Sequence, residues 1–440
     1  MTGQFRVGII GGGTGGLCLA QALRKAGVPV AVYERSGVRT DRLQGYRVHI
    51  NPKGARALHE CLPPDQWQAF VETCGSPGGA FRFVNEQLKE LLLIEDEVTS
   101  GTDRDPARSH HSVSRITLHQ VLSAGLADVL HLDKEFERYE RADDGTITCH
   151  FADGTTATAD VLVGADGANS RVCRQYLPAA RRIDTGIRAI AGKLPLTEDV
   201  RRWLPHRMQD GPTNVLPPSG CGMFMAPHDL SDSLLSATAN SIGGNDESAR
   251  LGLHFDNTTS YLMWSYAANR GTFPVDDAQL STLDGVGLRD LAGRQIAGWH
   301  PDLRRVVAET PGETVTLLPI RTSVPVNQWD TTNITVLGDA IHSMTPFRGI
   351  GANTALRDAQ LLARNLIDAA QGRRELRAAI RDYETQMIDY GFAAVRLSLR
   401  TAEQTISNNW LGRAMFKTAL RFFALVPPLK RKVFADLGND

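Results

Sequence analysis

The 440-residue sequence predicts an α/β fold with an inserted domain of mixed or antiparallel sheet and helices at the C-terminal end. Short β-branched runs that end in glycine turns are typical of buried parallel strands. Between residues 181 and 327, apolar runs alternate with turns rich in Pro, Gly and Asn, which is typical of a sheet of short strands. Past Gly351 the apolar residues recur at helical intervals through 355–370, 376–397 and 410–425.

The first predicted strand, 7–10, leads into a glycine turn and then into a helix that ends before residue 27. Gly11, Gly13 and Gly16 give this turn the spacing G-x-G-x-x-G. Such glycines permit a tight turn, close approach of a pyrophosphate and close helix–strand packing, and the phosphates meet the positive end of the helix dipole. Glu34, after a second strand, can accept hydrogen bonds from a ribose. Together these features predict a site for an ADP-containing dinucleotide; the alternative is a structural turn.

The segments after Glu34 continue the alternation of strands and helices. A strand at 45–50 places Arg47 and His49 on one face, and a turn then leads to a helix over 55–62. For Arg47 we favour contact with a cofactor or substrate over a solvated edge, and for His49 we favour the solvated edge over such contact. Further along, the sequence predicts a hairpin, a polar stretch, a helix and a three-stranded meander at 81–94, 99–108, 115–126 and 136–159.

Acidic residues stand at the carboxyl ends of three predicted strands. They are Glu34, Asp166 and Asp339, and the strands are 28–32, 161–163 and 333–337. Ligands of open α/β sheets bind at the carboxyl ends of the strands, so these turns indicate one extended ligand across the edge of the sheet. Asp339 could accept hydrogen bonds from that ligand or cap a helix, and both alternatives stay open.

Composition and charge exclude several classes of protein. A formal net charge of −1 gives no reason to expect nucleic acid, and no apolar run approaches the roughly 20 residues of a membrane span. The six cysteines form no C-x-x-C pair and the histidines no zinc spacing, which indicates reduced thiols and no metal site. We expect no signal peptide, because the first predicted strand begins at residue 7. We expect a cytoplasmic monomer or homodimer.

Three motifs in this order resemble the class A flavoprotein monooxygenases, the para-hydroxybenzoate hydroxylase-like family. They are the glycine turn with Glu34, the stretch G-A-D-G-A-N-S at 164–170, and G-D-A-x-H-x-x-x-P-x-x-G-x-G-x-N at 338–353. The resemblance covers residues 1 to about 370 and implies a Rossmann-like FAD-binding domain of that family's type. The family usually has an arginine seven residues after the middle aspartate. Here Cys173 takes that position and Arg174 follows, which leaves the NAD(P)H contacts open.

The resemblance implies FAD held tightly without a covalent bond, and NAD(P)H that visits transiently, since no second dinucleotide motif is present. In the family the last aspartate binds the ribityl chain or pyrophosphate, and the turn around Gly349 lies against the flavin ring. His342 is either a structural histidine or a proton-transfer group. The expected cofactor-binding residues are Gly11, Gly13, Thr14, Gly15, Gly16, Glu34, Arg35, Arg47, Arg115, Asp166, Asp339, Pro346, Gly349, Gly351 and Asn353.

The same resemblance divides the chain into alternating parts of two domains and a helical end. The FAD-binding domain takes 1–75, 103–180 and 330–375, the substrate domain takes the hairpin 76–102 and residues 181–329, and the C-terminal helices take 376–440. These boundaries are expectations.

The implied activity is that of an FAD-dependent monooxygenase. NAD(P)H reduces the flavin, O₂ adds to give a C4a-hydroperoxide, and an aromatic or lipophilic small molecule, by resemblance a secondary metabolite, is hydroxylated or epoxidised. Arg47 and His49 are the candidate catalytic residues. The alternatives are a flavin oxidase or dehydrogenase that transfers no oxygen, an NAD-dependent dehydrogenase, and a flavin-binding scaffold. The apolar residues of 222–266 suit such a substrate, and equally a plain sheet core.

The stretch 410–432 predicts an amphipathic helix followed by a basic cluster. One face would carry Leu411, Met415, Leu420, Phe423 and Leu425, and another Arg413, Lys417 and Arg421. We expect the apolar face to pack on the protein and the charges to face solvent. The alternative is a basic amphipathic helix on an anionic membrane, which three basic residues on one face favour less.

Overall fold

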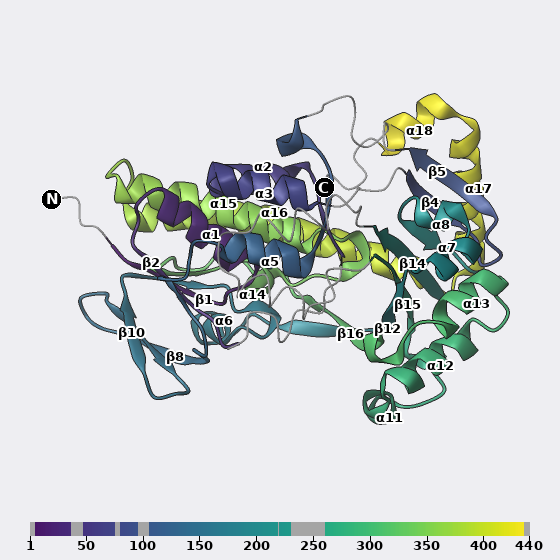
Figure 1. Cartoon of the computed structure of the whole chain (residues 1–440). Helices are drawn as coiled ribbons and strands as arrows, with labels where there is room; N and C mark the ends of the chain where they lie inside the picture. Colours follow the sequence, from purple (N-terminus) through teal and green to yellow (C-terminus); the bar gives the residue numbers. More distant parts are fainter. Residues whose placement is uncertain are drawn as a thin grey trace.

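The computed structural model describes residues 5–36, 47–74, 80–95, 105–218, 220–229 and 260–434. Several predicted segments fall outside these ranges in whole or in part: the run 233–237, residues 37–42 of the loop after Glu34, residues 45–46 of the next strand and residues 99–104 of the polar stretch. The described chain forms two sheet-based halves, and the long helix α16 (Leu376–Thr405) extends from one toward the other (Figure 1).

The first half is built on a parallel sheet with the order β17-β11-β1-β2-β7. Its strands are β1 (Val7–Ile10), β2 (Val30–Tyr33), β7 (Leu130–His131), β11 (Val161–Gly164) and β17 (Ile334–Val336). β1 and β11 are buried at every position, as expected for apolar runs that are covered on both faces. The predicted Rossmann-like α/β sheet is confirmed.

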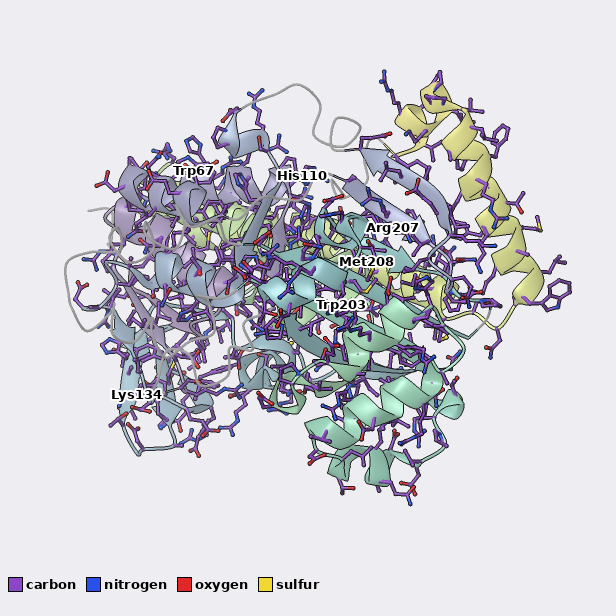
Figure 2. All side chains as sticks on the ribbon, turned by 45° about the vertical axis from the view of Figure 1, so that its right-hand side comes forward. Trp67, His110, Lys134, Trp203, Arg207 and Met208 are labelled. Atoms are coloured by element: carbon purple, nitrogen blue, oxygen red, sulfur yellow. The ribbon has the colours of Figure 1, made fainter. Side chains whose placement is uncertain are left out.

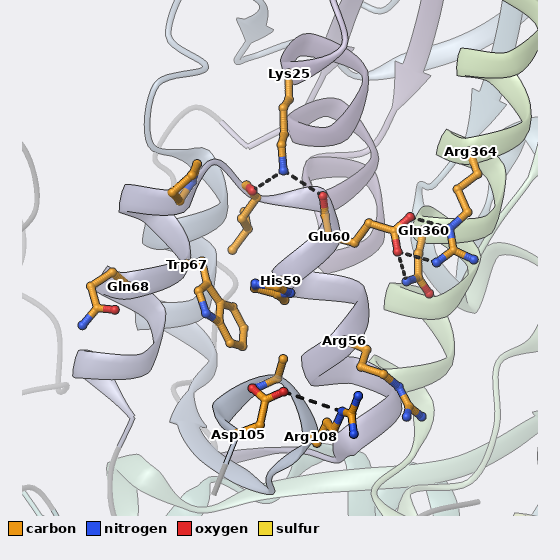
Figure 3. Close-up of a pocket in the computed structure, with 13 residues that line it drawn as sticks. Lys25, Arg56, His59, Glu60, Trp67, Gln68, Asp105, Arg108, Gln360 and Arg364 are labelled. Atoms are coloured by element: carbon orange, nitrogen blue, oxygen red, sulfur yellow. Dashed lines mark hydrogen bonds and ion pairs between the residues drawn. The ribbon is translucent and has the colours of Figure 1, made fainter.

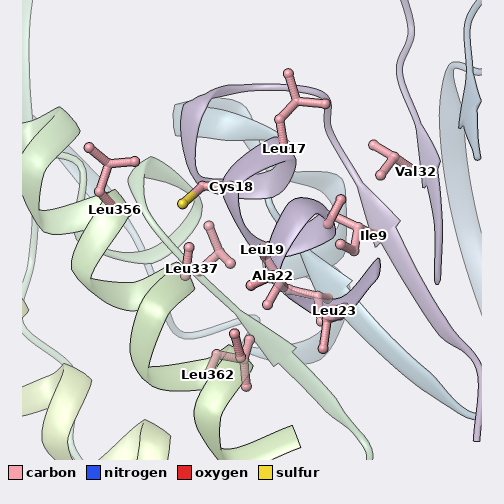
Figure 4. Packing of buried hydrophobic residues seen from close by; sticks show 14 of the residues in the cluster. Ile9, Leu17, Cys18, Leu19, Ala22, Leu23, Val32, Leu337, Leu356 and Leu362 are labelled. Carbon is pink, nitrogen blue, oxygen red and sulfur yellow. The ribbon is translucent and has the colours of Figure 1, made fainter. Parts of the chain in front are cut away.

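Helices cover this sheet and bury its apolar residues. They are α1 (Thr14–Lys25), α2 (Pro52–Cys61), α3 (Pro64–Thr73), α5 (Arg115–Ser123), α6 (Arg171–Tyr176), α14 (Asp339–His342), α15 (Gly351–Ala370) and α16. Ile9 and Val32 of the sheet share one core with Leu19 of α1 and with Leu356 and Leu362 of α15 (Figure 4). The helix after the glycine turn is thus held between the first strand and a helix more than 330 residues later.

Two small sheets and three short 3₁₀ turns complete this half. β8 (Phe136–Arg141), β9 (Ile147–Phe151) and β10 (Thr156–Ala159) form the predicted antiparallel meander. β3 (Arg47–Ile50) pairs with β6 (His111–Ser114), a strand that the sequence did not indicate. The 3₁₀ turns are η1 (Pro106–Arg108), η2 (Gly167–Asn169) and η5 (Pro346–Arg348).

The second half is a seven-stranded sheet with the order β16-β12-β15-β14-β13-β4-β5. Its strands are β4 (Ala80–Val84), β5 (Glu90–Glu95), β12 (Arg182–Pro195), β13 (Thr213–Val215), β14 (Cys221–His228), β15 (Tyr261–Asn269) and β16 (Thr316–Ser323). β13 and β4 are parallel and the other neighbours antiparallel, so the predicted mixed sheet is confirmed. The predicted hairpin is β4–β5 and joins this sheet; the domain boundaries stay a prediction.

One face of the seven-stranded sheet is covered by helices that the sequence analysis did not predict. They are α7 (Glu198–Trp203), α8 (His206–Gln209), α11 (Asp277–Thr282), α12 (Gly285–Gln295) and α13 (Pro301–Ala308), with 3₁₀ turns η3 (Arg270–Thr272) and η4 (Gly312–Thr314). Their apolar residues, such as Leu291 and Val306, pack around the buried Trp264 of β15. Start signals were present in the sequence, since Asp276 and Gln279 form a capping box and Pro301 begins α13.

The C-terminal helix α17 (Trp410–Leu425) has the predicted bounds, and α18 (Pro427–Phe434) follows it. The expected orientation of α17 is right for Leu420 and Phe423, which pack with residues of β5. It is wrong for Leu411, Met415 and Leu425, which are exposed, and for Arg413, which is buried. The guanidinium of Arg413 finds backbone carbonyl oxygens inside the protein, which fixes the helix with its apolar side outward. Within the ranges given above, no helix combines the length and the apolar character that are needed to cross a membrane.

Candidate active site

The sheet of the first half brings the acidic turns to one edge. In the register of the parallel strands, the last residues of β1, β2, β11 and β17 lie side by side. The glycine turn, Glu34, Asp166 and Asp339 follow these residues and therefore leave the sheet at its carboxyl edge. In open α/β sheets this is the edge at which ligands bind.

Within the glycine turn, Gly11 and Gly16 serve the packing of the protein itself. Gly11 has φ +110°, and a Cβ there would lie 2.3 Å from the carbonyl oxygen of Ala165. A Cβ on Gly16 would lie 2.2 Å from the carbonyl oxygen of Gly11. A Cβ on Gly13 would meet no atom within 4 Å, and no side chain caps the helix α1 that begins next to it. The space in front of α1 is therefore open, and only a bound group would require glycine at position 13.

Glu34 closes the glycine turn from the neighbouring strand. Its Oε2 accepts a hydrogen bond from the backbone N–H of Gly12 at 2.7 Å, and its Oε1 accepts one from Ser36 at 3.0 Å. The opposite side of the turn is held by His119, whose Nε2 lies 3.0 Å from the carbonyl oxygen of Gly12. Because a carboxylate offers about four acceptor positions, Glu34 keeps capacity for a ligand.

Asp166 is used by the protein itself. Its carboxylate accepts hydrogen bonds from the hydroxyl of Ser170 and from the backbone N–H groups of Arg171 at 2.7 Å and Val172 at 3.3 Å. Burial raises the pKa of Asp166, against the opposing effect of these hydrogen bonds. The carboxylate of the second motif is therefore already occupied, and what this motif presents to a ligand at the sheet edge is mainly the backbone of its turn.

Asp339 is held differently from Asp166. Its side chain is exposed and accepts no hydrogen bond from the residues that the structure describes. α14 begins after Gly338, which has φ +62°, and no side chain caps it, so the capping alternative for Asp339 is wrong. The carboxylate is free to accept hydrogen bonds from a ligand at the edge of the sheet.

A buried hub lies beneath the turn that carries Asp339. One oxygen of Asp358 accepts a hydrogen bond from the backbone N–H of Gly338 at 2.7 Å and lies 2.6 Å from His342 Nε2, and the other accepts from the Tyr390 hydroxyl at 2.6 Å. Burial alone would lower the pKa of His342, but the Asp358 carboxylate outweighs it and the pKa is raised. These contacts favour the structural alternative for His342.

The third motif is tied to β3 by one side chain. Asn353 Nδ2 donates to the carbonyl oxygen of His49 at 2.8 Å, and its Oδ1 accepts from the backbone N–H of Asn51 at 2.9 Å. Gly349 has φ +64° and a Cβ there would meet nothing within 4 Å. Asn353 thus positions a glycine loop whose outer side is open.

The residues expected to bind the cofactor divide by exposure. Those that are at least partly exposed are Gly13, Thr14, Glu34, Arg35, Arg47, Arg115, Asp166, Asp339, Pro346, Gly349 and Gly351. The buried ones are Gly11, Gly15, Gly16 and Asn353. The buried group shapes the turns, and the exposed group is available for contact; their roles in binding stay predictions.

Arg47 and His49 lie on β3, at the junction of the two halves. Arg47 Nε donates to the hydroxyl of Ser112 at 2.6 Å, and burial lowers its pKa to about 10, so that it stays charged at neutral pH. His49 Nε2 lies 3.0 Å from Nδ1 of His110, which Figure 2 shows between the halves, and the two rings are stacked. Burial, together with Arg47 and His110, lowers the pKa of His49 to about 3. His49 is therefore neutral at neutral pH.

The seven-stranded sheet adds three buried side chains. Lys193 of β12 and His228 of β14 were not indicated by the sequence, whereas Tyr261 of β15 is one of the apolar residues of 222–266. His228 lies beside Tyr261 in the register, with ring centroids 5.2 Å apart, and Lys193 Nζ lies 5.2 Å from the centroid of the Tyr261 ring. Neither ring nitrogen of His228 has a hydrogen-bond partner in the described part of the chain. Burial, then the charge of Arg47 on β3, lowers the pKa of His228 to about 4, so Arg47 lies within electrostatic range of this group.

These three residues lie on the face of the sheet that the helices α11–α13 do not cover. Because successive residues of a strand point to opposite faces, Lys193 and Ala189 share a face, whereas Leu194 points to the helices. At its other end this face is apolar: Ala189 and Ile320 pack with the end of α16 and with Phe347 of η5. We call this whole surface, polar at one end and apolar at the other, the polar face of the seven-stranded sheet. Its apolar end contacts Phe347 of the third motif.

A cavity of about 790 Å³ lies elsewhere, between α2, α3, η1 and α15 (Figure 3). Lys25, at the end of α1 opposite the glycine turn, borders it, and none of the predicted site residues does. Two ion pairs lie in its wall, Glu60 with Arg364 and Asp105 with Arg108. The cavity is therefore distinct from the candidate site.

Known proteins resemble this chain in sequence. Residues 9–74 match the NAD(P)-binding Rossmann-like domain and residues 295–398 match the FAD binding domain. The chain is 29% identical over 396 residues to the dual O-methyltransferase/FAD-dependent monooxygenase CTB3 of Cercospora beticola, which covers 86% of this chain and 44% of that protein. It is 25% identical over 429 residues to 6-hydroxynicotinate 3-monooxygenase of Bordetella bronchiseptica, covering 92% and 94%. The chain spans less than half the length of the first curated relatives it matches.

Solved structures agree with the sequence relatives. A protein of Photorhabdus luminescens described as an FAD-containing monooxygenase is 37% identical, has a TM-score of 0.79 and is covered over 98% of its length by 91% of this chain. Klebsiella pneumoniae HpxO, solved with FAD and uric acid, shares the fold at 20% identity with a TM-score of 0.75, covering 100% of this chain and 97% of its own. The family resemblance inferred from the three sequence motifs is confirmed. This chain belongs to the para-hydroxybenzoate hydroxylase-like family of FAD-dependent monooxygenases.

Proposed function

We propose that this chain uses FAD, NAD(P)H and O₂ to hydroxylate or epoxidise a small aromatic or lipophilic molecule, of the kind found in secondary metabolism. The observation that carries this proposal is the position of the open turns of the first sheet next to the polar face of the second. Bound FAD supplies the electron transfer and the activation of oxygen, while the protein binds, orients and excludes water.

We assign the ADP part of FAD to the open space at Gly13. The uncapped start of α1 offers backbone N–H groups to the pyrophosphate, and no Cβ obstructs them. Glu34 would accept hydrogen bonds from the ribose, and the exposed Asp339 from hydroxyl groups of the ribityl chain. Arg35 and Arg115, both exposed, would add positive charge near the phosphates.

We assign the flavin ring to the loop around Gly349 and Gly351. Their lack of side chains allows backbone N–H groups to approach a ring and to stabilise negative charge that develops on it. The buried Asn353 ties the loop to β3 by a hydrogen bond to the carbonyl oxygen of His49. Phe347 packs against the polar face of the seven-stranded sheet. This loop would therefore hold the ring toward the substrate side.

We infer that the substrate carries an acidic oxygen. Lys193 and Arg47 bring positive charge to one end of the polar face, and His228 offers two ring nitrogens without partners. A phenolate or carboxylate would be attracted by this positive charge and would accept a hydrogen bond from the one N–H of the neutral His228 ring, and an aromatic ring would extend toward Phe347. The relatives 6-hydroxynicotinate 3-monooxygenase and 3-amino-4-hydroxybenzoate 2-monooxygenase have names that denote such molecules, which supports this inference.

The cofactor and the reaction are tested in two steps. The purified protein should show the absorption bands of a flavin, and the product formed under ¹⁸O₂ should contain one labelled oxygen atom. A colourless protein that cannot be reconstituted with FAD would overturn the cofactor assignment. Release of hydrogen peroxide with an unlabelled, oxidised product would instead assign an oxidase.

The acidic-oxygen inference is tested by Lys193→Met. In a panel of phenols, each measured beside its methyl ether by quenching of flavin fluorescence, the variant should bind the phenols about tenfold to a hundredfold more weakly, since a charged hydrogen bond is lost. Binding of the ethers should not change. Lys89→Met, at an exposed turn, is the matched control. Equal weakening of phenols and ethers would contradict the inference and indicate a change of packing.

A further inference from the structure

Large apolar side chains are exposed mainly on one segment of the described chain. Nine are exposed, and seven of these lie between residues 410 and 433 on α17 and α18. Leu411, Met415, Phe422 and Leu425 lie on one side of α17, because intervals of four, seven and three residues amount to nearly whole turns. These four, which we call the apolar face of α17, are between 54% and 81% exposed.

The apolar face points outward because the opposite side of the helix is fixed to the protein. Arg413 is buried and donates to the carbonyl oxygen of Pro217 at 2.9 Å. Leu420 packs with residues of β5, and Lys430 of α18 donates to the carboxylate of Glu95 at 2.6 Å. Rotation of α17 to bury its apolar face would break these contacts. The helix forms an outer edge of the molecule in both views (Figures 1 and 2).

The segment that carries the apolar face is itself positively charged, and it packs against Glu86 and Glu95. Residues 410–434 include six basic residues and no acidic one. Arg413 and Lys430 are anchored inside, and Lys417 lies 3.7 Å from Glu86. The three exposed basic residues, which we call the basic rim, are Arg421, Arg431 and Lys432.

Charge decides between the two kinds of partner that could cover such a surface. A second copy docked about a two-fold axis would present the same patch, so the basic rim would lie against itself and repel. An anionic lipid surface accepts apolar side chains among its acyl chains and attracts basic residues at its headgroups. The surface therefore fits a membrane better than another copy of the chain.

We propose that α17 lies in the interface of an anionic lipid bilayer, with its apolar face toward the acyl chains and the basic rim at the headgroups. With 16 residues, α17 is shorter than the roughly 20 residues of a membrane span, so the helix lies on the bilayer and does not cross it. This proposal replaces the expectation, drawn from the sequence, that the helix packs on the protein and does not contact a membrane. The inference does not depend on the proposed reaction, although a lipophilic substrate would be most concentrated in such a layer.

Vesicle sedimentation tests the proposal with the full-length, FAD-loaded protein. At physiological salt we expect it to pellet with vesicles of phosphatidylcholine mixed with phosphatidylglycerol, and far less with phosphatidylcholine alone. Serine at all four positions of the apolar face should abolish binding. Glutamine at each position of the basic rim should lower the partition coefficient about fivefold. The double variant Ile183→Ser, Val286→Ser, which removes exposed apolar residues elsewhere, should bind like the wild type.

Failure of the intact protein to bind the mixed vesicles overturns the proposal, and so does undiminished binding by the four-serine variant. Light scattering after gel filtration tests the second copy: a wild-type dimer that becomes a monomer in the four-serine variant, without vesicle binding, would assign the apolar face to that contact. If the four-serine variant loses its flavin or its fold, the triple glutamine variant of the basic rim decides, because its side chains are exposed.

Discussion

The carboxyl edge of the five-stranded sheet and the polar face of the seven-stranded sheet contribute to the site in different ways. At the edge, the open positions Gly13 and Gly349 and the uncapped start of α1 expose backbone. On the polar face the backbone is occupied by strand pairing, and charged or aromatic side chains such as Lys193 and His228 form the surface. One part of the site is made of main chain, and the other of side chains.

The two parts therefore tolerate different substitutions. A main-chain site needs glycine at fixed intervals, because only the absence of a Cβ allows a ligand to approach the backbone. A side-chain site needs charge at strand positions that point to one face, and many sequences provide this. The first part should fail when a few methyl groups are added, and the second when a charge or an imidazole is removed.

The largest effect is expected for Gly13→Val. The residue has φ −81° and ψ −177°, which valine adopts without strain, so the protein should fold and remain soluble. Its side chain would occupy the space that we assign to the pyrophosphate, and the purified protein should contain almost no FAD. Flavin absorbance per mole of protein measures this. Gly298→Val, at an exposed position with equal space for a Cβ, should keep its flavin. Near-stoichiometric FAD in Gly13→Val would show that the glycine turn does not bind the cofactor.

Asp339→Ala should have the next largest effect, because it removes a carboxylate that the protein itself leaves unused. Loss of one or two charge-assisted hydrogen bonds should weaken FAD binding by about 2–4 kcal/mol. Dialysis followed by fluorescence titration gives the dissociation constant. Asp143→Ala, in an exposed hairpin turn, is the control. An unchanged dissociation constant would mean that the carboxylate does not contact the flavin.

His228→Asn tests the polar face through pH. The pKa of His228 is lowered from its ordinary value of 6.5 to about 4, so the stability due to its neutral form is present above pH 6.5 and is lost as the pH falls toward 4. Between pH 7 and pH 5 this group should cost the wild type about 2 kcal/mol of unfolding free energy. Urea unfolding at both pH values should show that His228→Asn lacks this loss of unfolding free energy. The control variant His206→Asn, at an exposed position, should still show it. Equal pH dependence in all three proteins would contradict a buried neutral imidazole.

The part of the site that is made of main chain could be predicted from the sequence. Sequence spacing alone determines a strand, a glycine turn and a helix, so β1 and α1 were found together with the meander at 136–159. The family motifs located the other turns at the edge. Which of these residues serve packing, as Gly16 does, and which remain open, as Gly13 does, depends on contacts with Ala165 and Gly11 that only the fold creates.

The part of the site that is made of side chains could not be predicted, because it depends on which strands become neighbours in the sheet. Lys193 is brought beside Tyr261 by the pairing of β12 with β15, in which Lys193 lies opposite Met263, 70 positions later in the sequence. The helix α12 was missed since Gly287 and Gly293 interrupt the apolar period. The helices α11 and α13, with 6 and 8 residues, are too short to show a clear helical period. The orientation of α17 was partly wrong because hydrophobic pattern alone cannot show that Arg413 finds buried carbonyl oxygens.

The hub at Asp358 has a consequence for the synthesis of the protein. This carboxylate holds the backbone of Gly338 and is itself held by Tyr390, so the turn that presents Asp339 has all its supports only when residue 390 of 440 has left the ribosome. The parallel sheet, too, waits for β17, since non-local strands pair late. The turn that we assign to the ribityl chain can therefore be completed only after residue 390 has been translated. Until then the first strands lack their neighbour β17, and chaperones would protect the nascent chain in that interval.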